Sequence, residues 1–267
     1  MKHSDRSFRL PTWASFAAIL LAAPLLLWIE YGEPMTDDAV LLPMMRMALS
    51  RLIASAVFTV ILLSQGYHIL NPLRKPFGRS LLWCLPAFAV AVNNMPILAL
   101  ITGQVRILHG EPVYWGWFVL ECFAIGLFEE ITFRGVVLLR FAESRRDTHR
   151  GLLVSIFLSS AVFAAMHLVN LFAGAGPGAV ILQIGYSFLI GAMCAVVLFK
   201  TANLWLCVAL HAIYDFGGRM IESLGAGRLW DTPTVVFTAV LAVATTVYMV
   251  LLFARMKPRE TDRIYFE

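Results

Sequence analysis

The sequence predicts an all-α polytopic membrane protein with about eight transmembrane helices that surround an internal polar cavity. Of its 267 residues, 60% are hydrophobic and only 14% are charged, and the mean hydropathy is +0.77. A soluble domain is about 45–50% apolar and about 25% charged. This chain has too little polar surface to cover a water-soluble fold of its size. A cytosolic enzyme, a disordered protein and a nucleic-acid-binding module are therefore excluded.

Apolar windows of membrane-spanning length follow one another along the whole chain. None of them alternates in polarity as an outer-membrane strand does. Backbone groups in hydrocarbon must be hydrogen-bonded within their own segment, so each window is expected to be a helix. The eight windows cover residues 12–29, 47–65, 81–101, 113–140, 151–172, 179–199, 203–222 and 234–254. Together they predict a single membrane domain over residues 1–267.

The distribution of basic residues predicts how the chain is oriented. Fifteen of its 21 Lys and Arg residues fall in segments that eight crossings would place on one side of the membrane. The first loop on the other side is acidic, with Glu30, Glu33, Asp37 and Asp38. By the positive-inside rule, both termini are expected to face the cytoplasm. The fifteen are Lys2, Arg6, Arg9, Arg74, Lys75, Arg79, Arg140, Arg145, Arg146, Arg150, Lys200, Arg255, Lys257, Arg259 and Arg263.

The third window has an irregular composition, because it contains Pro86, Asn93, Asn94 and Pro96. Each proline removes a helical hydrogen bond. Irregular backbone at membrane depth is tolerated against protein or a water-filled cavity. We therefore expect a broken helix, which either borders a cavity or kinks for packing alone.

The fourth window carries charges that a membrane helix rarely contains, namely Glu121, Glu129, Glu130 and Arg134. Each charge near the centre of a bilayer costs about 3 kcal/mol, so neighbouring helices must hold this one. Glu130 and Arg134 are spaced i, i+4 with the acid first, which favours an intrahelical ion pair. Glu129 lies about 100° around the helix and is left without that partner. Glu121 is expected to be a solvated residue of a cavity wall.

Three further polar groups fall at membrane depth, namely His167, His211 and Asp215. At about 1.5 Å per residue, they and Glu129 lie about 15–24 Å from the cytoplasmic ends of their helices. Three helices thus bring two carboxylates and two imidazoles to one level. A lone histidine in a membrane, such as His167, could equally be an interhelical hydrogen-bonding residue, whereas His211 with Asp215 one turn away favours function, as does their agreement in depth. Arg219 and Glu222 are expected to form a structural or interfacial pair.

These residues form three short motifs in a fixed order. Glu129 to Arg134 resembles the E-E-x-x-x-R motif of the CAAX-protease and bacteriocin-processing (CPBP, or Abi) family of intramembrane glutamic endopeptidases, which includes the Ras-converting CAAX endopeptidase. Phe163 to His167 is similar to its F-x-x-x-H motif, and His211 to Asp215 to its H-x-x-x-N/D motif. The resemblance covers residues 113–222, where the catalytic helices are expected. One departure is Asp215, where the Ras-converting branch has Asn.

The resemblance implies an intramembrane endopeptidase of the bacterial inner membrane that cleaves a membrane-anchored protein or peptide. Glu129 would activate water, while His167, His211 and Asp215 would position the water and stabilise the oxyanion. Glu130, Arg134 and Phe163 would support these four residues. Asp215 either carries a proton or orients His211. No cofactor is expected, and the expected partners are the substrate and the lipid bilayer, with no nucleic acid.

Three alternatives remain open from the residues. Glu129, His167, His211 and Asp215 could instead bind Zn²⁺ in a metal-dependent version of the protease, although no H-E-x-x-H motif is present. A proton-coupled transporter also uses buried Glu and His and a broken helix. A non-catalytic protein of bacteriocin immunity, or a scaffold, would not need the chemistry of Glu129.

Overall fold

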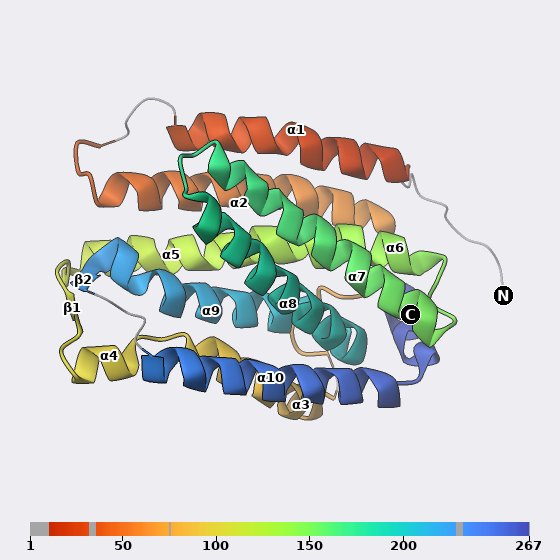
Figure 1. Ribbon diagram of the computed structural model, residues 1–267. Coiled ribbons are helices and arrows are strands. Elements are labelled where there is room, and N and C mark those ends of the chain that lie inside the picture. The colour runs from red at the N-terminus through yellow and green to blue at the C-terminus, as the bar shows by residue number, and fades with distance from the viewer. Residues whose placement is uncertain (1–10, 32–35, 75, 228–231, 267) are drawn as a thin grey trace.

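The computed structural model describes residues 11–31, 36–74, 76–227 and 232–266 as a bundle of long helices (Figure 1). The beginning of α1 and the C-terminal end of the chain lie at the same end of this bundle (Figure 1). Part of the orientation argument falls on residues outside those described. These residues are Lys2, Arg6, Arg9, Glu33 and Lys75.

The predicted all-α class is confirmed, because almost all of the described regular structure is helical. Two three-residue strands, β1 and β2, pair antiparallel with Val105 opposite Gly227. The helical elements are α1 (Thr12–Tyr31), α2 (Leu41–Gln65), α3 (Phe77–Asn93), α4 (Ile97–Ile101), α5 (Pro112–Glu129), η1 (Glu130–Leu138), α6 (Leu139–Glu143), α7 (His149–Met166), η2 (His167–Leu171), α8 (Pro177–Thr201), α9 (Leu204–Leu224), α10 (Thr232–Arg255), η3 (Pro258–Thr261) and α11 (Asp262–Tyr265). The strands are β1 (Val105–Ile107) and β2 (Gly225–Gly227).

Every predicted window coincides with helix, and five helical stretches among the described residues are long and apolar enough to cross a membrane. The other three windows correspond to α1, to α5 with η1, and to α9, and the last two carry the predicted charges. A count of eight crossings therefore stays a prediction. The five stretches are Leu41–Gln65, Phe77–Ile101, His149–Leu171, Pro177–Thr201 and Pro233–Arg255.

The third window is broken as predicted, between α3 and α4, and the break packs against α9. The side-chain amide of Asn94 donates a hydrogen bond of 2.7 Å to the carbonyl of Tyr214. A Cβ on Gly217 would lie 2.6 Å from the carbonyl carbon of Asn94, so glycine is needed for this approach. The break therefore anchors α9, which carries two of the candidate residues, and the packing interpretation holds at this point.

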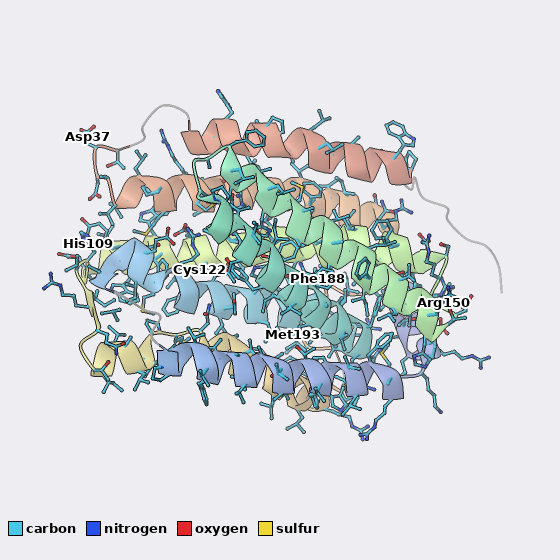
Figure 2. All side chains as sticks on the ribbon, viewed as in Figure 1. Asp37, His109, Cys122, Arg150, Phe188 and Met193 are labelled. Atoms are coloured by element: carbon cyan, nitrogen blue, oxygen red, sulfur yellow. The ribbon has the colours of Figure 1, made fainter. Side chains whose placement is uncertain are left out.

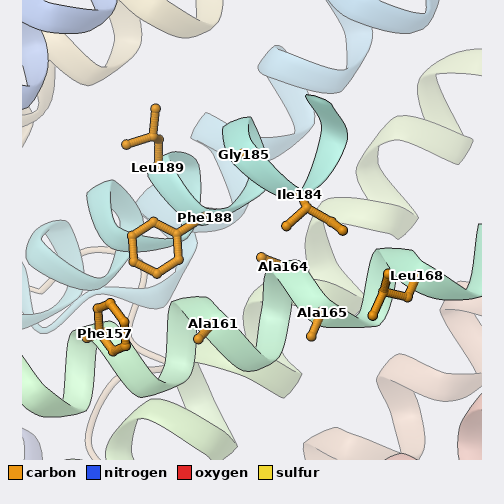
Figure 3. Close-up of a pocket in the computed structure, with 9 residues that line it drawn as sticks. All are labelled: Phe157, Ala161, Ala164, Ala165, Leu168, Ile184, Gly185, Phe188 and Leu189. Atoms are coloured by element: carbon orange, nitrogen blue, oxygen red, sulfur yellow. The ribbon is translucent and has the colours of Figure 1, made fainter. Parts of the chain in front are cut away.

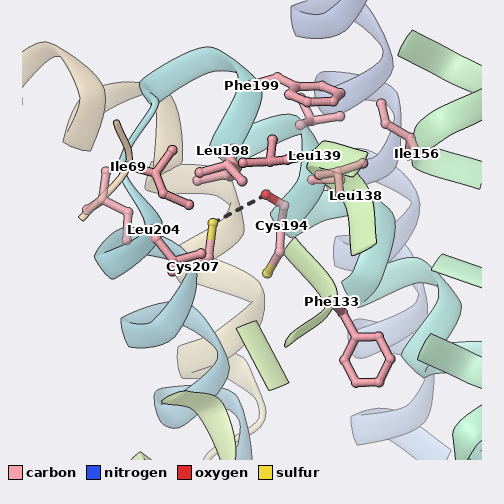
Figure 4. Close-up of a cluster of buried hydrophobic side chains, with 14 of the residues drawn as sticks. Ile69, Phe133, Leu138, Leu139, Ile156, Cys194, Leu198, Phe199, Leu204 and Cys207 are labelled. Carbon is pink, nitrogen blue, oxygen red and sulfur yellow. Dashed lines mark hydrogen bonds between the residues drawn. The ribbon is translucent and has the colours of Figure 1, made fainter. Parts of the chain in front are cut away.

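The core lies where the helices cross near the end of the bundle that contains the C-terminus. Leu138 and Leu139 pack there with Leu198 and Leu204, all of them buried (Figure 4). The Cys207 thiol donates to the carbonyl of Cys194, 3.3 Å away (Figure 4). All four cysteines are buried and free, as expected for packing residues.

Polar residues gather at the two ends of the bundle, with Asp37 and His109 at one end and Arg150 at the other (Figure 2). At the second end the C-terminal segment folds back over the bundle. Glu260 forms an ion pair of 2.8 Å with Lys200, at the end of α8. Partial burial raises the pKa of the Glu260 carboxyl, but hydrogen bonds from Lys200 and from the Lys257 backbone N–H outweigh it and hold the pKa below its ordinary value.

Candidate active site

The predicted E-E-x-x-x-R motif lies at a change of helix type. Glu129 is the last residue of α5, and Glu130 begins η1, which is a π-helix running to Leu138. The sequence predicts an ordinary helix here, so the π-helical segment is a difference. In a π-helix each turn holds an extra residue, and such segments occur frequently at functional sites. All nine residues of η1 are buried.

A close contact between α5 and α9 brings this motif to His211. A Cβ on Gly126 would lie 3.0 Å from the backbone nitrogen of Ala212 and 3.2 Å from the carbonyl oxygen of Val208. Only glycine allows the two backbones to approach so closely. Because Gly126 is three residues before Glu129, and Ala212 follows His211, this contact fixes the separation between the glutamates and the imidazole.

His211 lies between the two glutamates of the motif. Its Nδ1 is 2.7 Å from Glu130 Oε1 and donates a hydrogen bond to that carboxylate. Its Nε2 is 3.3 Å from Glu129 Oε2. The same Nε2 is 3.7 Å from Asp215 Oδ2, one turn further along α9. The structure therefore brings together Glu129, Glu130, His211 and Asp215.

Glu130 has a second partner, as the i, i+4 spacing predicts. Its Oε1 is 3.1 Å from Arg134 Nη1, and both side chains are at most 1% exposed. The guanidinium of Arg134 also lies over the ring of Phe163, 4.4 Å from its centroid. Glu130 thus orients His211 in addition to pairing with Arg134, a role that the sequence analysis did not assign to it.

Phe163 also connects the two histidines. Its ring is 5.2 Å from the His167 ring and 5.9 Å from the His211 ring, and it meets both edge to face. His167 lies where α7 ends and the 3₁₀ segment η2 begins. Its Nδ1 donates to the carbonyl of Phe163 at 3.1 Å, so its Nε2 is directed towards Ser187 Oγ, 3.5 Å away. The Phe163 ring is therefore in contact with both histidines of the candidate site.

Two carboxylates of the cluster are accessible and one is not. The Glu129 and Asp215 side chains are 16% and 17% exposed, whereas Glu130 is completely buried. Glu129 is thus the carboxylate that can meet water or substrate while it contacts an imidazole. Glu130 is the one that can act only through its neighbours.

Glu121 does not occupy the solvated position that we expected. Its side chain is 2% exposed and forms an ion pair of 2.6 Å with Arg219 of α9. Arg219 thus joins α9 to α5, and its expected interaction with Glu222 stays a prediction. The expectation failed because the spacing of residues along α9 gives no information about which residue of α5 faces them.

The candidate residues do not have the arrangement of a metal centre. Among the residues that the structure describes, no three His, Cys, Asp or Glu side chains converge in a way that could hold a metal ion. Both ring nitrogens of His211 already face carboxylates, and His167 contacts its own helix and Ser187.

An apolar groove lies on the outside of the bundle between α7 and α8, with a volume of about 620 Å³ (Figure 3). Its middle is lined by small residues, which include Ala161, Ala165 and Gly185, and Phe157 and Phe188 stack edge to face at one end. All nine lining residues are apolar, so the groove is suited to hydrocarbon. The residues of the cluster around His211 do not line it.

The sequence analysis overlooked two adjacent serines of α7 that face η1. The Ser159 hydroxyl donates to the carbonyl of Phe133 at 2.9 Å, within the π-helical segment. Ser160 is buried and lies near the Arg134 guanidinium across Gly191. Their spacing was the available signal, because Ser159, Phe163 and His167 follow one another at i, i+4 on one face of α7.

Comparison with known proteins identifies the same region. Residues 111–217 match the family described as Type II CAAX prenyl endopeptidase Rce1-like. This segment contains all seven residues of the three motifs, from Glu129 to Asp215. Neither a curated protein nor a solved structure matches the chain. The Rce1-like family is a family of proteases. The match of residues 111–217 of this membrane protein to the Rce1-like family supports the resemblance drawn from its motifs.

Proposed function

We propose that this protein is an intramembrane endopeptidase that hydrolyses a peptide bond of a membrane-anchored protein or peptide, with Glu129 as the base that activates water. The observation that carries this proposal is the position of His211. One of its nitrogens is held at 2.7 Å by the buried Glu130, and the other faces the accessible Glu129 at 3.3 Å. A base (Glu129), an imidazole that can carry a proton (His211) and a carboxylate that orients the imidazole (Glu130) therefore lie next to one another.

In the proposed reaction, Glu129 takes a proton from a water molecule as the water oxygen attacks the carbonyl carbon of the substrate. Negative charge then develops on the carbonyl oxygen and needs a preorganised hydrogen-bond donor. Protonated His211 supplies it through Nε2, and the Asp215 carboxylate, 3.7 Å from that nitrogen, stabilises the imidazolium. When the C–N bond breaks, the proton held by Glu129 passes to the leaving amine.

His167 is proposed to act through Nε2. Because its Nδ1 donates to the Phe163 carbonyl, Nε2 is the acceptor nitrogen, and in this proposal the water or the substrate takes the place of the long 3.5 Å contact from Ser187. Glu130 and Arg134 do not touch the substrate in this proposal. They hold the His211 ring in one orientation with Nε2 directed towards Glu129, as carboxylates beside catalytic histidines do.

The experiment is cleavage of candidate membrane peptides by purified protein in liposomes, compared between wild type, Glu129→Ala and His167→Ala. Glu222→Gln is the matched control, because Glu222 is an exposed carboxylate near the C-terminal end of α9. We expect cleavage by wild type and by the control, and none by Glu129→Ala. Cleavage that survives Glu129→Ala would overturn the mechanism. Substrates can be sought as uncleaved membrane peptides that accumulate in a Glu129→Gln strain.

The same preparation distinguishes the alternatives. We expect cleavage to be unaffected by a chelator, because the candidate ligands do not converge on a metal position. Inhibition that Zn²⁺ reverses would establish the metal-dependent version instead. Solute flux that depends on a pH gradient would favour a transporter, and a cellular function retained without Glu129 would favour a scaffold.

A further inference from the structure

The catalytic segment is contacted from α7 by two residues that have no place in the three motifs. Ser159 Oγ donates 2.9 Å to the carbonyl of Phe133, which is inside η1. A π-helix is less regular than an α-helix and depends on its surroundings to persist. This is a cross-helix bond to the backbone between Glu130 and Arg134.

The neighbouring residue Ser160 faces the side chain of Arg134. A Cβ built on Gly191 of α8 would be 3.2 Å from Ser160 Oγ and 3.3 Å from Arg134 Nη2. Both atoms therefore lie beside the same face of Gly191, and no hydrogen bond joins them directly. Neither atom has a hydrogen-bond partner in the described part of the chain, and both residues are at most 2% exposed, so one bridging water molecule would satisfy both atoms.

Gly191 is what allows this arrangement. The same Cβ would also be 3.2 Å from the Phe163 ring, on which the guanidinium stacks. Any side chain at this position would push against the guanidinium, the serine hydroxyl and the aromatic ring at once. The guanidinium is thus enclosed by the Glu130 carboxylate, the Phe163 ring, Ser160 and the backbone of Gly191.

We propose that Ser159, Ser160 and Gly191 are positioning residues of the active site. Ser159 fixes the backbone of η1, and Ser160 and Gly191 fix the Arg134 guanidinium. Arg134 in turn holds Glu130 against His211. The consequence for catalysis rests on the proposed peptidase function, whereas the consequence for the backbone of η1 does not.

The test compares Ser159→Ala, Ser160→Ala and Gly191→Ala with two matched controls. Ser155→Ala removes a buried hydroxyl of α7 that bonds only the carbonyl of Gly151, at 2.9 Å in its own helix. Gly185→Ala adds a methyl group on α8 at a position with nothing within 4 Å. These two controls measure how much a similar substitution elsewhere on α7 or α8 changes activity, stability and amide exchange.

Two measurements are made on each protein. For Ser160→Ala we expect kcat to fall roughly tenfold with KM unchanged, as for the loss of one hydrogen bond that reaches the guanidinium through water. Gly191→Ala should lower kcat in the same way, and it should also lower the melting temperature, because the new methyl group would lie 3.2–3.3 Å from three buried groups. The two controls should keep the wild-type kcat. For Ser159→Ala we expect hydrogen exchange of the amides in η1 to accelerate about fivefold.

These measurements keep the two proposals separate. Loss of cleavage in Glu129→Ala bears on the proposed function, and amide exchange in η1 can be measured whether or not any substrate is cleaved. Equal exchange in Ser159→Ala and Ser155→Ala would overturn the proposed role of Ser159. A wild-type kcat in both Ser160→Ala and Gly191→Ala would overturn the proposal that Ser160 and Gly191 position the Arg134 guanidinium.

Discussion

Removal of one member of the buried Glu130–Arg134 pair should destabilise the protein strongly, and removal of both charges should cost less than the two single losses added together. The two groups are 3.1 Å apart and at most 1% exposed. At that distance, with an effective dielectric constant of about 20, their attraction is about 5 kcal/mol. Breaking one side of a buried pair typically costs about 3–5 kcal/mol, because the remaining charge is left without a partner.

Arg134→Met removes the cation but keeps much of the side-chain volume, and Glu130→Gln keeps an oxygen that can accept from His211 Nδ1. We expect each single variant to lose about 3–5 kcal/mol of unfolding free energy, a large part of the usual total of about 5–15 kcal/mol. The double variant leaves no unpaired charge and should lose at least 2 kcal/mol less than the sum of the single losses, within the usual coupling range of about 0.5–3 kcal/mol. Peptidase activity should not return, because Arg134 no longer holds the residue at position 130.

The assay is equilibrium unfolding of the purified proteins in a single detergent, followed by circular dichroism. A loss below about 1 kcal/mol in Arg134→Met would show that the pair is not desolvated as the structure indicates. Additive losses in the double variant would show that the two residues do not act on each other. Either result would refute the reasoning.

Three further predictions follow from individual contacts. Asp215→Asn removes the charge 3.7 Å from His211 Nε2 and should lower kcat roughly tenfold in the peptide assay, and an unchanged kcat would exclude a role for its charge. Gly126→Ala puts a methyl group 3.0 Å from the backbone of Ala212 and should cost about 1–3 kcal/mol in unfolding, whereas Gly116→Ala on the same helix, with nothing within 4 Å, should not. The ionised Glu260 side chain should contribute at most about 1 kcal/mol to the free energy of unfolding. Because its pKa is lowered in the folded state, this contribution is present above the ordinary pKa of Glu and is lost as the pH falls through the lowered pKa. Glu260→Gln should thus melt below wild type at pH 7 and together with it well below about pH 4, and a difference that persisted there would contradict the sign.

The sequence predicted those features of the site that depend on spacing along one helix. The pair between Glu130 and Arg134 follows from the i, i+4 rule, and the break before Pro96 follows from the chemistry of proline. Both depend on residues within about one turn of each other, so no neighbouring helix is needed to predict them.

The features that the sequence did not predict depend on how one helix is rotated against another. Depth along a helix gives the level of His211 but not which carboxylate it faces, and so its bond to Glu130 was not foreseen. The sequence likewise does not indicate how α5 is rotated against α9. Glu121 was therefore wrongly expected to be solvated, whereas it forms an ion pair with Arg219. The π-helical segment is stabilised by contacts such as the one from Ser159, and local pattern carries no sign of it.

The central claim is that Glu129 activates the water that cleaves the substrate. The most direct test is the cleavage rate of Glu129→Gln under single-turnover conditions, because glutamine keeps the shape of the side chain and removes its basicity. The account predicts a rate about 10²–10⁴-fold below wild type, with an unchanged melting temperature because the side chain is 16% exposed. A rate within a few-fold of wild type would contradict it.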